Sequence, residues 1–117
     1  MFEFPKSARL LKSEQYTAVF RGAEINISAG PLRIRAIKNR MPTARLGLVV
    51  TKKGTPKANR RNRVKRIIRE KFRLQATDLP NIDLVIQVFG QIDDVQLHRS
   101  VDKLFALIER DFEQANE

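Results

Sequence analysis

The chain has 117 residues, of which 42% are hydrophobic, and a formal net charge of +10. We expect one domain over residues 1–117 with a single modest core, and the basic balance favours a polyanionic partner. The absence of cysteine excludes disulfides, thiolate metal sites and a cysteine nucleophile. Because the sequence has neither a membrane-spanning apolar run nor the apolar stretch of a signal peptide, we expect a cytoplasmic protein without a membrane partner.

Positive charge is concentrated in the first two thirds of the chain. Residues 1–73 contain 20 Lys and Arg against four Asp and Glu, whereas residues 74–117 contain three against nine. A polyanion is therefore expected to bind the first two thirds of the chain. The crowding of cations there also predicts that the fold gains stability from bound phosphate or sulfate.

The first predicted element is a short helix between Ser13, a suitable N-cap, and Gly22, a suitable C′ residue. Tyr16, Val19 and Phe20 share one face at helical spacing. Core packing is the simplest interpretation of this face, above all for Val19. The two aromatic residues also suit a stacking platform for unpaired bases, and the sequence alone does not separate these interpretations.

Alternating strands are predicted next, after a possible edge strand over residues 24–28. Residues 32–36 and residues 45–53 each alternate apolar positions with cationic or small ones. Gly47 leaves room for a close approach on the second of these strands. If the two strands pair, one sheet face gathers four cations: Arg33, Arg35, Arg45 and Lys53.

The most basic segment covers residues 57–73, with nine Lys and Arg residues and Glu70 as its only acid. We predict a helix from about residue 58 to residue 75. Its apolar residues repeat at the spacing of a core-facing stripe: Val64, Ile67, Ile68 and Phe72. The opposite side carries Asn62, Arg66, Arg69 and Arg73.

Three cations in the first turn of this helix, Arg60, Arg61 and Arg63, oppose the helix macrodipole. The helix therefore needs a nearby anion, and a phosphate held by arginine forks and free N–H groups would serve. A solvated charged face is the alternative interpretation. Such faces usually mix charges of both signs, and this helix has a single acid, so we favour a polyanion-binding helix.

The remaining sequence predicts a strand rich in β-branched residues over residues 82–89 and then a long helix capped by Asp93 or Asp94. Apolar residues of that helix repeat at helical spacing: Leu97, Val101, Leu104, Phe105, Ile108 and Phe112. The element order αβββαβα predicts an α+β fold, a single-domain sandwich of helices on one sheet.

No residue pattern points to chemistry performed by the protein. His98 is the only histidine and has no metal-ligand partners at a suitable spacing. Glu70 and Asp78 are too isolated for a metal pair, and neither a catalytic triad nor a phosphate-cradling glycine loop can be assembled. We therefore expect no catalytic and no metal-binding residue, so any reaction would belong to a partner.

Two stretches resemble the signature of the bacterial ribonuclease P protein component: GLVVTKK, which ends at Lys53, and RNRVKRIIREKFR, which begins at Arg61. The similarity extends to FPKSARLLKSEQYTAVF near the start and DLVIQV before the last helix. Thr51 and Tyr16 depart from the family, which often has Ser and Phe there. Members bind a large catalytic RNA and with it remove the 5′ leader of precursor tRNA.

The resemblance implies a ribosomal S5 domain 2-like fold with a left-handed βαβ crossover that carries the basic helix, an exception to the usual handedness. It also implies that the RNA holds Mg²⁺ and performs the endonucleolytic hydrolysis, so the protein alone binds no cofactor. The expected partners are the catalytic RNA and the precursor tRNA leader, and the expected state without RNA is a monomer.

The expected site residues divide into two sets. The resemblance places Arg61, Asn62, Arg63, Lys65 and Arg66 on the catalytic RNA, within a wider basic set: Lys52, Lys53, Arg60, Arg61, Asn62, Arg63, Lys65, Arg66, Arg69 and Arg73. It also implies a leader cleft between the first helix and the sheet, lined by Tyr16, Phe20, Arg33, Arg35 and Lys53.

Other classes share some of these features. A ribosomal or ribosome-assembly protein would show the same charge and fold type and would leave precursor tRNA cleavage unchanged. A DNA-binding regulator could place the basic helix in a major groove, but no helix immediately before it completes a helix-turn-helix. An autonomous nuclease lacks the residues it would need.

Overall fold

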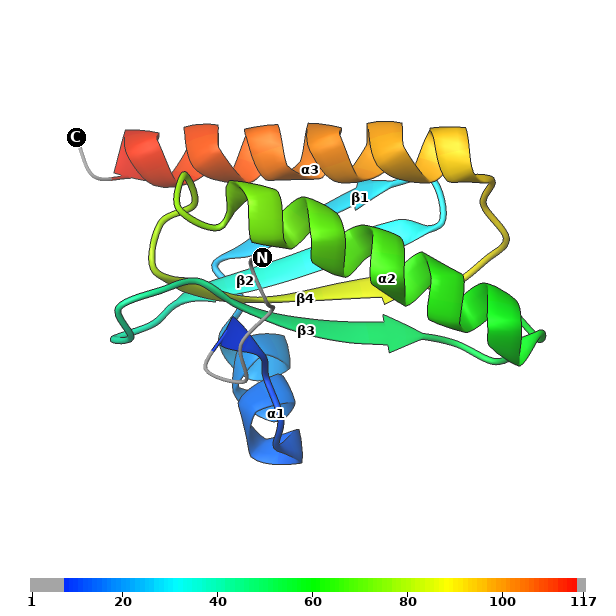
Figure 1. The fold of residues 1–117 in the computed structure, drawn as a ribbon. Coiled ribbons are helices and arrows are strands. Elements are labelled where there is room, and N and C mark those ends of the chain that lie inside the picture. The colour runs from blue at the N-terminus through cyan, green and yellow to red at the C-terminus, as the bar shows by residue number, and fades with distance from the viewer. Residues whose placement is uncertain (1–7, 116–117) are drawn as a thin grey trace.

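The computed structural model describes the backbone of residues 8–115 and the side chains of residues 8–112. This part of the chain forms three helices and four strands in the predicted order (Figure 1). Their bounds are α1 Ser13–Gly22, β1 Ile25–Ala29, β2 Leu32–Lys38, β3 Arg45–Val50, α2 Ala58–Gln75, β4 Ile82–Val88 and α3 Asp94–Ala115. The predicted α+β class and the predicted bounds of the basic helix are confirmed.

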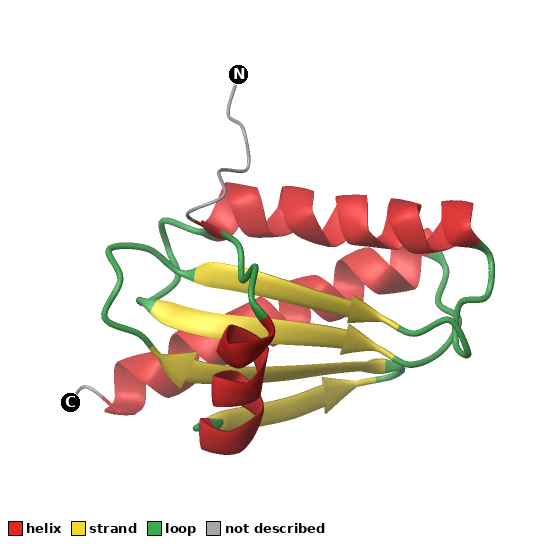
Figure 2. Cartoon of the chain, turned by 90° about the horizontal axis from the view of Figure 1, so that it is seen from below, coloured by secondary structure: helices red, strands yellow, loops and turns green. Residues whose placement is uncertain are grey.

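The strands form one mixed sheet in the order β1-β2-β4-β3. The β1–β2 and β2–β4 pairs are antiparallel, and the β3–β4 pair is parallel. Helix α2 makes the crossover between the parallel strands. With both strands pointing up and α2 toward the viewer, β4 lies to the left of β3, so the crossover has the expected left hand (Figures 1 and 2).

The expected pairing of residues 32–36 with residues 45–53 is wrong, because β4 lies between β2 and β3. Six of the seven β4 residues are buried. A strand this apolar belongs in the centre of a sheet, where both faces are covered. Sequence alternation shows the two faces of a strand and carries no information about its neighbour.

Helices α2 and α3 cover one face of the sheet, and α1 crosses the other (Figures 1 and 2). The main core lies between the sheet and the two long helices. It contains Val64, Ile68 and Phe72 of α2 and all six predicted stripe residues of α3. The Phe72 and Phe105 rings meet edge to face, 6.5 Å apart.

A smaller core beneath α1 contains Leu10, Val19 and Val85. The predicted N-cap is displaced, since Ser13 already lies inside α1 and Gln15 Oε1 accepts hydrogen bonds from the N–H groups just before it. Gly22 is the last residue of α1 and has no positive φ. A Cβ there would lie 2.7 Å from Ile37 Cδ1, so its role is close packing on β2.

Strand β3 ends earlier than predicted, at Val50. A turn follows in which Thr51 Oγ1 accepts a hydrogen bond from the Gly54 N–H at 3.1 Å. Lys52 and Lys53 are therefore exposed turn residues next to the start of α2.

Candidate nucleic-acid interface

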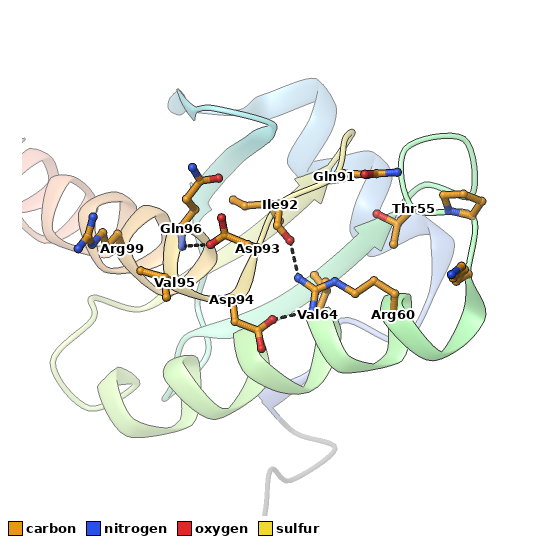
Figure 3. A pocket seen from close by; sticks show the side chains of 12 residues that line it. Thr55, Arg60, Val64, Gln91, Ile92, Asp93, Asp94, Val95, Gln96 and Arg99 are labelled. Atoms are coloured by element: carbon orange, nitrogen blue, oxygen red, sulfur yellow. Dashed lines mark hydrogen bonds and ion pairs between the residues drawn. The ribbon is translucent and has the colours of Figure 1, made fainter.

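The start of α2 is held against the start of α3 by one carboxylate. Asp94 accepts a hydrogen bond from Arg60 at 2.6 Å (Figure 3). It also accepts hydrogen bonds from Arg63 at 2.5 and 2.9 Å. Arg60 also donates to the carbonyl oxygen of Ile92. The hydrogen bonds from Arg63 and then Arg60 lower the pKa of the Asp94 carboxyl from 3.8 to about 2. The anion that the first turn of α2 needs is thus supplied by the chain itself.

Further cations of α2 also have partners within the chain. Arg61 donates to the carbonyl oxygens of Thr55 and Pro56, at 3.0 and 2.8 Å, and so braces the loop before the helix. Glu70 hydrogen-bonds Arg73, which lowers the pKa of the glutamate. On the side facing α3, Lys71 pairs with Asp102 at 2.7 Å.

A second group of cations has no acidic partner among the described residues. It comprises Lys52, Lys53, Lys65, Arg66 and Arg69, and the neutral Asn62 lies among them. Lys52, Lys53, Asn62 and Arg66 are exposed. We call these six residues the open basic set. Six of the ten residues expected on the catalytic RNA therefore form an accessible surface that the acids of α3 do not neutralise.

A small cationic pocket lies where α2 meets the start of the chain and β3. Its volume is about 150 Å³, and its polar lining comes from Arg9, Tyr16, Lys65 and Arg69. Burial, and then the nearby charge of Arg9, lower the pKa of Arg69. Two guanidinium groups this close raise the local positive potential, which a bound phosphate would relieve. Arg9 was not among the predicted site residues, because nothing in the local sequence pattern links it to α2.

The aromatic residues of α1 lie against the sheet with arginine beside them. The Tyr16 ring rests on Gly47, where a Cβ would approach Tyr16 Cε1 to 2.6 Å, and the Tyr16 hydroxyl accepts a hydrogen bond from the Leu48 N–H at 3.3 Å. The Arg35 guanidinium lies over the Phe20 ring, 5.2 Å from its centroid. The predicted close approach at Gly47 is confirmed.

Core packing of the α1 face is confirmed for Val19, and base stacking on Tyr16 and Phe20 stays a prediction. Val19 is fully buried, as expected for a core residue, whereas Tyr16 and Phe20 are half-buried and only pack on the edge of that core. Arg33 lies on the same sheet face, and its Nε donates weakly to Ser28 Oγ at 3.4 Å.

Two residues of the expected basic sheet face are placed differently. Arg45 is on the α1 face, but Asp83 neutralises it through hydrogen bonds of 2.6 and 2.7 Å, which raise the pKa of the arginine. Lys53 lies in the turn after β3 and not on the strand. Arg33 and Arg35 therefore remain on the α1 face without an acidic partner among the described residues, and a four-cation strand face is not formed.

A larger hollow lies elsewhere, between the starts of α2 and α3 (Figure 3). It has a volume of about 1100 Å³ and is lined by cations such as Arg60 and Arg99 and by the acids Asp93 and Asp94. Asp93 caps α3, as predicted, through Oδ1 and the Gln96 N–H at 2.8 Å. Charges of both signs make this hollow a poor site for a polyanion.

Residues 8–115 contain no group of three or more side chains suited to hold a metal ion. His98 is exposed on α3. None of the helices in these residues is long and apolar enough to cross a membrane.

A small α+β domain with a basic βαβ crossover helix on one face of its sheet, and with aromatic and arginine side chains on the other face, defines the class of protein. The model of the Ribonuclease P family matches residues 4–110, and the chain therefore belongs to the ribonuclease P protein family, as the resemblance indicated. Membership makes it a protein subunit of a ribonuclease P, with an RNA partner.

Solved structures agree with this assignment. An RNase P protein from Staphylococcus aureus superposes with a TM-score of 0.79 at 21% identity and covers 87% of this chain and 95% of its own. An RNase P protein from Thermotoga maritima superposes with a TM-score of 0.68 at 30% identity, covering 87% of this chain and 96% of its own.

The Asp94 contacts predict a specific acid sensitivity. The folded pKa of Asp94, about 2, lies below its ordinary 3.8, so its charge stabilises the fold above pH 3.8 and this contribution is lost as the pH falls toward 2. We expect Asp94→Asn to lower the Tm near neutral pH, and the difference from the wild type to vanish by about pH 2. Thermal unfolding followed by circular dichroism would measure it.

The matched control is Asp111→Asn on α3, whose acid reaches Arg110 only at 3.9 Å. Its Tm should track the wild type across the whole pH range. A pH-independent difference for Asp94→Asn would show that the arginine contacts contribute nothing through the charge of the carboxylate.

Proposed function

We propose that the chain binds the catalytic RNA of ribonuclease P through the open basic set and the cationic pocket, and the 5′ leader of precursor tRNA through the groove between α1 and the sheet. The RNA performs the endonucleolytic hydrolysis that produces the mature tRNA 5′ end. The position of Tyr16 supports this proposal most, because Tyr16 packs beside Phe20 against the small core beneath α1 and also lines the cationic pocket. The two surfaces are therefore contiguous.

The open basic set suits a folded RNA. Such an RNA presents dense phosphate, and exposed Lys and Arg bind it with an affinity that falls steeply as salt rises. Arg forks match phosphate oxygens in pairs, and the exposed Asn62 adds neutral donor and acceptor groups. Arg60, Arg61 and Arg63 have a further role on this proposal, since their contacts within the chain fix the helix that carries the other residues.

The groove suits a single strand of variable sequence. Stacking on the Phe20 and Tyr16 rings is possible for any base, at about 1–3 kcal/mol per base. Arg33 and Arg35 provide cations for the phosphates on the same face. Lys53, which was expected in this cleft, belongs on this view with the RNA-binding turn.

We assign the reaction to the RNA because the family resemblance implies it, and several acids among the described residues have structural roles. Asp83 and Asp94 each hold arginine, and Asp93 caps α3. The Mg²⁺ ions of the reaction are accordingly placed on the RNA. We further propose that the protein is a cytoplasmic monomer before it binds RNA.

Cleavage of a precursor tRNA by a bacterial ribonuclease P RNA at low millimolar Mg²⁺, with and without the protein, tests the proposal. We expect cleavage to depend on the protein, because its cations reduce repulsion between the two RNAs. Intact RNA binding without any enhancement would favour a ribosome-associated protein. The protein incubated without the RNA should leave the precursor uncut.

The open basic set predicts the behaviour of Lys65→Ala/Arg66→Ala. We expect weaker binding to the catalytic RNA, and a slope of log affinity against log salt reduced by about one for each lost phosphate contact. Filter binding across a salt series would measure both. These two residues avoid the structural contacts of Arg61 and Arg63.

Arg110→Ala is the matched control, since Arg110 is exposed on α3, outside the proposed surface. Its affinity and salt slope should equal those of the wild type. An unchanged slope in the double variant would remove α2 from the RNA interface.

The groove predicts an effect that depends on leader length. Phe20→Ala should raise the KM for a precursor with a long leader by about tenfold, the equivalent of one lost stacking contact, and leave a precursor with a single-nucleotide leader unaffected. Leu74→Ala, at an exposed apolar position near the end of α2 and outside both proposed surfaces, is the control. An equal loss for both precursors would mean that Phe20 acts on the fold and not on the leader.

A further inference from the structure

The sheet face that carries α1 is only partly covered. Among the described elements α1 alone crosses this face, and the ends of β3 and β4 extend beyond it (Figure 2). The uncovered floor is built from neighbouring register positions: Arg33 of β2 pairs with Gln87 of β4, and Gln87 pairs with Val49 of β3. It continues the groove in which Tyr16 and Phe20 lie.

An aromatic ring ends this floor. The Phe89 N–H donates to the Pro31 carbonyl oxygen at 2.9 Å, so the sheet pairing extends to this residue. Val88 is fully buried in the main core, which puts the side chains of Gln87 and Phe89 on the α1 face. Phe89 is 47% exposed, so much of its side chain is accessible to a ligand.

The amide of Gln87 lacks a partner. Its Oε1 is buried, and no donor in the described part of the chain reaches it, although part of the side chain remains at the surface. A buried acceptor without a donor is unfavourable, and a ligand that supplies the donor would remove this cost. The amide could turn toward a ligand without breaking any hydrogen bond of Oε1 to the described residues.

We propose that Gln87 and Phe89 form a second base-binding subsite, which selects a leader base with an exocyclic amino group. The inference rests on the proposed function and names a base preference within it. Phe89 stacks on the base, Gln87 Oε1 accepts a hydrogen bond from its amino group, and the Arg33 guanidinium binds the neighbouring phosphate.

The subsite is separate from the one at Phe20. Phe20 packs against the cluster that contains Val85, and four residues of strand span about 13 Å from Val85 to Phe89. That length is several times the spacing of about 3.4 Å between stacked bases. The two rings therefore serve different nucleotides of one strand that runs along β4.

The chemistry of the Gln87 amide oxygen determines which base is preferred. An amino group projects from the edge of adenine or cytosine and can reach a recessed oxygen. Uracil has a carbonyl oxygen where cytosine has this amino group, and its N–H lies between two carbonyl oxygens that repel Oε1. Cytosine and uracil have nearly the same shape, so they isolate the hydrogen bond from stacking.

The test uses the full chain assembled with a bacterial ribonuclease P RNA. Precursor tRNAs carry an all-uridine leader in which one cytidine is moved stepwise, and their dissociation constants are measured. We expect the wild type to bind one cytidine position about fivefold more tightly, the worth of one hydrogen bond, and Gln87→Leu to lose this preference. Gln87→Glu keeps an acceptor and should keep the preference, even with weaker binding overall.

Phe89→Ala should weaken binding of uridine and cytidine leaders alike, with recovery in Phe89→Tyr. Val95→Ala, at an exposed apolar position on α3, should match the wild type. The inference is overturned if the wild type shows no preference at any position, or if Gln87→Leu retains it. Urea unfolding of each variant shows whether a loss reflects the fold.

Binding of the free protein to cytidine and uridine octamers separates this inference from the proposed function. If the protein fails to activate the RNA but prefers the cytidine octamer, and Gln87→Leu does not, the subsite holds and the proposed function fails. If the RNA is activated and the octamers bind equally to the wild type and to Gln87→Leu, the subsite is wrong and the proposed function stands.

Discussion

The crowding of positive charge on α2 is the constraint to which the rest of the structure responds. Cations in the first turn of a helix oppose its macrodipole, and their mutual repulsion adds to that cost. The chain offsets the cost with α3, whose Asp94 and Asp102 hold Arg60, Arg63 and Lys71. The acids of the last third thus serve to fix α2 in place.

The pairing with α3 divides the cations of α2 into two groups, according to the side of the helix on which they lie. Those that face α3 are neutralised, whereas Lys65 and Arg69 face β3 and the start of the chain, where the described residues offer no acid. Arg9 adds a further positive charge on the side of α2 that faces β3. The hydrogen bond from the Leu10 N–H to the Leu46 carbonyl oxygen, 2.9 Å long, lays residues 9 and 10 along the edge of β3 and brings Arg9 to the pocket. Positive potential is therefore concentrated at one edge of the molecule.

Much of the fold could be predicted because each element carries its own periodic signal. The stripes of α2 and α3 are long, and their predicted residues are buried except Ile67, which is half-buried at the edge of the core. The strand order could not be predicted, since β3 and β2 show the same alternation whether or not β4 lies between them. The N-cap of α1 lies one residue away from the predicted position, because Gln15, and not Ser13, accepts the hydrogen bonds from the free N–H groups at the start of the helix.

The candidate site was predictable in its parts and not in its contacts. The composition of α2 indicated a polyanion surface, but which cations are open depends on Asp94, more than 30 residues away in sequence. Asp94 was considered only as a cap. The proximity of Arg9, Tyr16 and Arg69 likewise arises from three separate elements, and the free acceptor of Gln87 is visible only once its neighbours are in place.

Contiguity of the two surfaces has an electrostatic consequence for the proposed assembly. A catalytic RNA and a precursor tRNA leader repel each other, and at physiological salt this repulsion reaches about 8 Å. Tyr16 lines both the groove and the cationic pocket, so the two strands would approach within about that distance around a single side chain. Cations lie on both sides of Tyr16: Arg35 is beside Phe20, and Arg69 is in the pocket. Their positive charge would then attract both polyanions at once. Mg²⁺ would otherwise have to supply that screening, so the proposed assembly predicts that the protein lowers the Mg²⁺ concentration that the catalytic RNA needs.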